Sequence, residues 1–65
     1  MKVKFIEHLQ KLGADARASG ASFLSNPFLR SKTLPANSGD SLEVWTRKHD
    51  AWHLGWTVED AMHVG

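Results

Sequence analysis

The chain has no cysteine, only two prolines, and no long apolar run among its 65 residues. The lack of cysteine excludes disulfides and thiolate metal sites, which stabilise many small domains. Because the apolar runs are short, we expect no membrane-spanning segment, and no apolar core with a cleavage site follows the N-terminal lysines, so we expect no signal peptide. These absences favour a small cytoplasmic protein that folds as a single domain over residues 1–65.

Net charge is also scarce, at +1, but it is unevenly distributed. Residues 1–39 carry six basic and two acidic side chains, whereas residues 40–65 carry two basic and five acidic ones. One interpretation is that the two halves attract each other across a helix pair. The other is a basic face for RNA or another acidic partner. The cations that would form this face are Lys2, Lys4, Lys11, Arg17, Arg30 and Lys32.

Residues 2–19 are predicted to form a helix because apolar side chains recur there at helical spacing. Those side chains are Phe5, Ile6, Leu9, Leu12 and Ala16. Gly20 stands where a glycine commonly ends a helix. Gly13, Ala16 and Gly20 are small and three and four residues apart, which predicts a shallow groove that a tryptophan from elsewhere fills.

A second helix is predicted over residues 41–61. Asp40 suits its N-cap, with Glu43 three residues later as the second half of a capping box. An apolar seam interrupted by one histidine follows, made of Leu42, Trp45, His49, Trp52 and Trp56. Gly55 lies between two large rings, which favours close approach of another backbone. The predicted fold is therefore all-α, with two helices packed through Phe5, Leu9, Leu12, Ala16, Trp52 and Trp56.

The connector, residues 20–40, is predicted to be a long linker. Asn26-Pro27 is a turn signal, and Phe23 and Phe28 are expected to anchor it to the core. From residue 29 onward we expect a loop, because Pro35 and the Asn-Ser-Gly run after it do not continue a helix. We predict that residues 31–39 are mobile in the free protein and order on a partner. The alternative is a plain spacer.

The chain resembles the ribosome modulation factor family, including its CrpP-like small proteins. The family pattern is Gly-x-x-Ala-x-x-x-Gly, then a Pro-aromatic pair, then Trp-x-x-Gly-Trp. Here these positions are Gly13, Ala16, Gly20, Pro27, Phe28, Trp52, Gly55 and Trp56. Asn26 before the proline is the form typical of the CrpP-like branch. The connector is much longer than in ribosome modulation factor, the N-terminus is less basic, and the tail after Trp56 is acidic.

The resemblance implies a helix–linker–helix fold whose tryptophans pack on the small-residue side of the first helix. It also implies binding to the small ribosomal subunit near its message-binding region, and promotion of idle ribosome dimers. CrpP-like relatives are linked to ATP-dependent modification of fluoroquinolones, but no phosphate-binding glycine loop is present here.

Residues that could carry chemistry are few. His49 and His53 have a spacing that can chelate a metal, but no third ligand has a fixed place, so we favour a seam-edge His49 and an exposed His53. Two helices offer little concavity, so we expect no catalytic residue, cofactor or metal. The tryptophans are expected in the core, although a residual aromatic patch would serve a partner, a homodimer or RNA stacking.

Two classes of function follow. The first is a regulatory binding protein that engages the ribosome or rRNA and promotes hibernation. The alternative is a phage- or plasmid-borne module that binds a host protein, with a CrpP-like fluoroquinolone-modifying protein as a weaker reading.

Overall fold

Two long helices dominate the computed structural model, which describes residues 3–63. Helix α1 spans Val3–Ala18 and helix α3 spans Leu42–Met62. The connector between them forms three short 3₁₀ helices, Phe23–Ser25, Pro27–Leu29 and Ser31–Thr33, and one turn of α-helix, α2, Pro35–Ser38. The all-α prediction is confirmed, since residues 3–63 contain no strand.

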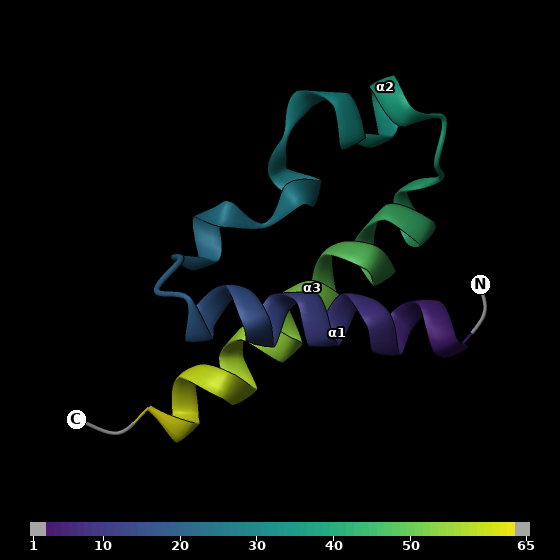
Figure 1. Cartoon of the computed structure of the whole chain (residues 1–65). Helices are drawn as coiled ribbons and strands as arrows, with labels where there is room; N and C mark the ends of the chain where they lie inside the picture. Colours follow the sequence, from purple (N-terminus) through teal and green to yellow (C-terminus); the bar gives the residue numbers. More distant parts are fainter. Residues whose placement is uncertain (1–2, 64–65) are drawn as a thin grey trace.

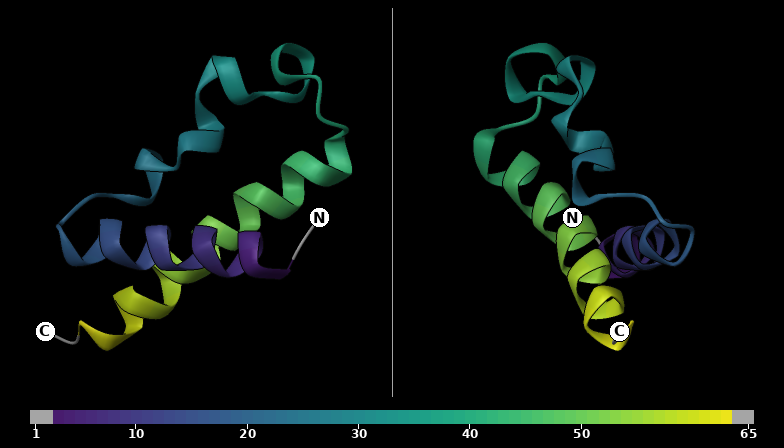
Figure 2. Two further views of the ribbon diagram at one scale, coloured as in Figure 1. Left: turned by 45° about the vertical axis from the view of Figure 1, so that its right-hand side comes forward. Right: turned by 90° about the vertical axis from the view of Figure 1, so that its left-hand side faces the viewer.

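The two long helices cross, and both run in the same general direction (Figure 1). The connector must therefore return from the C-terminal end of α1 to the N-terminal end of α3. Seen along α1, it arches over one side of the helix pair (Figure 2). Within residues 3–63, no helix is both long enough and apolar enough to cross a membrane.

Backbone contact between two glycines and the facing helix sets the crossing. A Cβ atom on Gly13 would overlap the backbone carbonyl of Trp52, and one on Gly55 would overlap the backbone carbonyl of Gln10. The predicted close approach at Gly55 is confirmed. The predicted filling of the small-residue groove by a tryptophan ring is wrong at Gly13, because the backbone of Trp52 occupies that space.

The buried apolar side chains among the described residues are few: Leu9, Ala51 and Trp52. Phe5 and Leu12, predicted to pack between the helices, keep about two fifths of their surface exposed, each at 41%. They lie at the edge of the α1–α3 contact, where the ammonium of Lys48 lies 5.7 Å from the centre of the Phe5 ring. The apolar core between the helices is small because the close backbone contact at Gly13 and Gly55 leaves little space for side chains.

Gly20 ends α1 as predicted. It adopts a positive φ of 90°, and the amides of Gly20 and Ala21 donate to the carbonyls of Arg17 and Ala16. This is the Schellman arrangement that satisfies the last carbonyls of a helix. No atom lies near the position of a Gly20 Cβ, so Gly20 is not part of a groove for a ring.

The start of α3 differs from the predicted cap. Ser41, not Asp40, is the N-cap, and its Oγ accepts a hydrogen bond of 3.1 Å from the amide of Val44. Asp40 instead forms an ion pair of 2.8 Å with Lys48 two turns along. The predicted capping box is therefore wrong, because α3 begins one residue later and Lys48 on the same helix holds the carboxylate of Asp40.

The connector is more regular than the predicted loop. Pro35 occupies the first turn of α2, where its missing amide proton costs nothing and its φ suits a helix. Side-chain oxygens start two of the 3₁₀ helices, with Ser22 Oγ accepting from the amide of Leu24 and Asn26 Oδ1 from the amide of Phe28. The expectation that the run from Pro35 forms no helical turn is wrong.

Candidate functional site

The predicted cations do not form one patch. Lys4 and Lys11 lie exposed on α1, while Arg30 and Lys32 lie exposed on the connector, which rises away from α1 in Figure 1. Lys2 lies outside the described residues. The cations predicted to act together are therefore divided between two elements of the fold.

Ion pairing separates the basic side chains of residues 3–63 into a paired group and an unpaired group. Arg17 bonds to Asp60 through Nε at 2.7 Å, Arg47 pairs with Glu43, and Lys48 pairs with Asp40. Among residues 3–63, no carboxylate pairs with the side chains of Lys4, Lys11, Arg30 and Lys32. The second group keeps its charge available to an external anion.

Arg17 makes contacts within the fold that join α1 to α3. Its guanidinium lies 5.8 Å from the centre of the Trp56 ring, in addition to its ion pair with Asp60. Both contacts join α1 to the C-terminal half of α3. The prediction that basic α1 and acidic α3 attract each other is realised at this pair, so Arg17 is a poor candidate for contact with a partner.

Four rings form a stacked row along the connector side of α3. Trp45 stacks on His49 at 5.1 Å, His49 on His53 at 6.1 Å, and His53 on Trp56 at 6.5 Å between ring centres. Phe23 packs edge-on against His53 and Trp56. The row runs from Trp45 through His49 and His53 to Trp56, so each histidine ring has an aromatic ring on both sides.

Partly buried hydrogen bonds join the connector to the same side of α3. Trp45 Nε1 donates to the carbonyl of Phe28 at 3.0 Å, and Trp56 Nε1 donates to the carbonyl of Ala21 at 2.8 Å. Asn26, only 2% exposed, donates through Nδ2 to the carbonyl of His49 at 3.1 Å. These bonds make Trp45 and Trp56 structural anchors. Both side chains are half-buried, and of the three tryptophans Trp52 is the one buried in the core as predicted.

Pro27 and Phe28, the Pro-aromatic pair of the sequence motif, belong to this region of the connector. Phe28 is half-buried and supplies the carbonyl that Trp45 holds, while Pro27 begins a 3₁₀ helix and its carbonyl accepts from Thr33 Oγ1. Phe23 is 47% exposed, so it lies on the aromatic row and not in the core, contrary to expectation. Ala16 is half-buried near the C-terminal end of α1.

The histidine pair does not assemble a metal centre. The ring of His49 hydrogen-bonds to Asp50 at 3.0 Å and stacks on His53. Within residues 3–63, no three histidine or acidic side chains gather as metal ligands would. The placement of His49 at the edge of the seam and of an exposed His53 agrees with the sequence interpretation.

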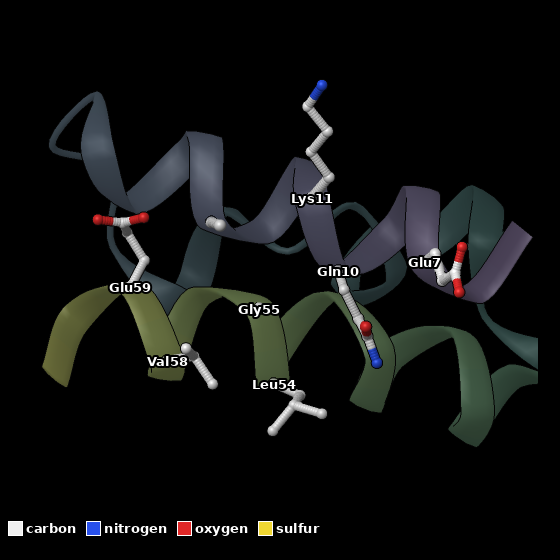
Figure 3. A pocket seen from close by; sticks show the side chains of 8 residues that line it. Glu7, Gln10, Lys11, Leu54, Gly55, Val58 and Glu59 are labelled. Carbon is white, nitrogen blue, oxygen red and sulfur yellow. The ribbon is translucent and has the colours of Figure 1, made fainter. Parts of the chain in front are cut away.

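A shallow groove lies between α1 and the C-terminal half of α3, with a volume of about 340 Å³. Its apolar lining residues are Ala14, Gly55, Leu54 and Val58, and its polar lining residues are Glu7, Gln10, Lys11 and Glu59 (Figure 3). The side chains of Lys11 and Leu54 point to opposite sides, away from the facing helix. All its lining residues belong to the two long helices, so the connector leaves this groove uncovered.

Sequence reasoning missed two features of this region. The burial of Asn26 depends on a carbonyl 23 residues away, which no local pattern reveals. The groove was also missed, although Leu54 and Val58 stand one turn apart outside the tryptophan seam, which is a readable signal.

Comparison with protein-family models, with curated proteins and with solved structures finds no match for this chain. The resemblance to the ribosome modulation factor family therefore stays a prediction carried by the motif residues.

Proposed function

We propose that this chain is a non-catalytic binding protein that engages a polyanion, with the ribosome and its RNA as the first target. The observation that supports the proposal is the set of exposed cations without carboxylate partners in residues 3–63. Arg30 and Lys32 are its centre, since they lie two residues apart on the connector.

The connector gives these two cations a defined position. The bonds from Trp45 and Asn26 fix residues 26–28 to α3, and Thr33 Oγ1 joins the next 3₁₀ helix back to the carbonyl of Pro27 at 2.6 Å. A cation held by short-range contacts loses less conformational entropy on binding than one on a free loop. Lys4 adds charge from α1.

Cosedimentation with ribosomes over a salt series tests the proposal. If Arg30 and Lys32 meet phosphates, the logarithm of the affinity falls linearly with the logarithm of salt concentration, and the slope counts the phosphates engaged. Arg30→Gln together with Lys32→Gln should reduce that slope by about 2.

The matched control is Arg47→Gln, which removes a cation already paired with Glu43 and should leave the slope unchanged. Absence of cosedimentation at low salt, or binding that ignores salt, would contradict the proposal. Salt-independent capture would instead favour the protein-partner alternative.

A further inference from the structure

The groove between α1 and α3 carries an exposed apolar pair. Leu54 is 51% and Val58 54% exposed, and they stand one turn apart on α3 among the residues that line the groove. In a soluble protein, contiguous exposed apolar surface with a charged rim is typical of an interaction site. The groove is on the side of the crossing that the connector does not cover, so no segment among residues 3–63 fills it.

The size of the core supports a partner subunit. Leu9, Ala51 and Trp52 are the buried apolar side chains among the described residues, and the sequence has no cysteine for a disulfide. Chains of this length have little core to stabilise them, and a partner subunit is one common source of further stability.

The charged residues that line the groove point to the identity of that partner. Glu7 and Lys11 are one turn apart on α1 and of opposite sign, and neither forms an ion pair within residues 3–63. A twofold axis that reverses α1 between them would set each Glu7 opposite Lys11 of the partner subunit. The same surface can thus pair with a copy of itself, which is the requirement of an isologous interface.

The charged pair and the apolar pair lie close to the same helix crossing. Gln10, next to Lys11 in the sequence, meets Gly55, which is next to Leu54. We propose that a second copy of this chain occupies the groove, so that the Leu54 and Val58 pairs of two copies bury each other under reciprocal Glu7–Lys11 contacts.

Sedimentation equilibrium across a concentration series tests the homodimer. The expected result is a species of twice the chain mass of 7.2 kDa, dissociating on dilution. Leu54→Glu should give monomers with unchanged helicity by circular dichroism. The control is Leu42→Glu, which alters an equally apolar residue, 68% exposed, in the first turn of α3 and away from the groove, and should leave the dimer intact.

Charge exchange tests the geometry without relying on the apolar pair. Glu7→Lys and Lys11→Glu should each weaken self-association by about tenfold or more, because like charges then face each other. Mixing the two variants should restore dimers, since every pair becomes complementary again. A wild-type chain that stays monomeric at millimolar concentration, a dimer that survives Leu54→Glu, or a mixture that fails to associate would each overturn the proposal. These results do not depend on ribosome binding.

Discussion

The side-chain amide of Asn26 donates a hydrogen bond to the backbone carbonyl of His49, across 23 residues of chain. The other side of the same amide accepts from the backbone of Phe28 at 3.0 Å. One buried side chain therefore both shapes the connector and attaches it to α3.

Replacing Asn26 should destabilise the fold. Asn26→Ala removes both bonds and leaves buried polar groups of the backbone without partners, which costs about 1–3 kcal/mol. The free energy of unfolding in urea measures this loss. Asn37→Ala is a matched control, because Asn37 also bonds to a backbone carbonyl, that of Ser31, but on an exposed turn. Equal losses in both variants would contradict the role given to burial.

Alanine at either crossing glycine should separate the helices. By helix propensity alone, Gly13→Ala or Gly55→Ala would stabilise by roughly 1 kcal/mol. The added methyl group instead meets the backbone of the facing helix, and such overpacking costs about 1–3 kcal/mol. We expect the steric effect to prevail, because helix backbones cannot move aside as flexible side chains do. A rise in melting temperature would show that the helices are not in contact there.

Gly20→Ala provides a different comparison. Nothing lies near the position of its Cβ, so its cost comes from the positive φ alone, about 1 kcal/mol. Gly20→Asn should recover part of this loss, since asparagine tolerates the left-handed conformation, whereas Gly13→Asn should not. Thermal unfolding of Gly13→Ala, Gly13→Asn, Gly20→Ala and Gly20→Asn distinguishes conformational strain from steric overlap.

The indole hydrogen bonds of Trp45 and Trp56 should limit how often the connector separates from α3. Trp45→Phe keeps an aromatic ring but loses the bond to Phe28, and Trp56→Phe loses the bond to Ala21, each at a cost of about 0.5–1.5 kcal/mol. Amide hydrogen exchange should then quicken around residues 26–29 in the first variant and around residues 21–25 in the second. Exchange that is unchanged in both would show that the connector is held by other contacts. In the wild type, residues 31–38 should exchange faster than residues 26–29, because within residues 3–63 no side-chain hydrogen bond joins them to α3.

The sequence allowed prediction of those features that depend on local signals. Apolar periodicity located α1 and α3, and Gly20 located the end of α1. Gly55 indicated that the backbone of another segment, here α1 at Gln10, comes close to α3. The errors occurred where a distant group decides the outcome. Asp40 has the chemistry of an N-cap, but Lys48 takes its carboxylate and Ser41 caps instead. Asn26 has the sequence context of a turn residue, and it becomes the most buried side chain among residues 3–63 beside the carbonyl of His49.

The candidate cations show the same limit. Sequence places Arg17 among the exposed charges of the N-terminal half, because it cannot show that Asp60, 43 residues away, comes within 2.7 Å. Arg30 and Lys32 keep the exposure that the sequence suggested. The charge asymmetry between the halves is thus used in part within the fold, where Arg17 joins the two helices, while Arg30 and Lys32 stay exposed without a carboxylate partner among residues 3–63.

Arg17 and Arg30 should accordingly respond in opposite ways to the same substitution. Arg17→Gln loses the ion pair and the contact with Trp56, so the free energy of unfolding should fall, while the salt dependence of ribosome binding should stay the same. Arg30→Gln should leave stability unchanged and reduce the salt slope by about 1. A double-mutant cycle of Arg17→Gln with Asp60→Asn should give a coupling energy of about 0.2–1 kcal/mol that shrinks in high salt, because both side chains are partly solvated. A coupling of zero together with a weaker salt slope in Arg17→Gln would place Arg17 in the binding surface and would contradict this division of roles.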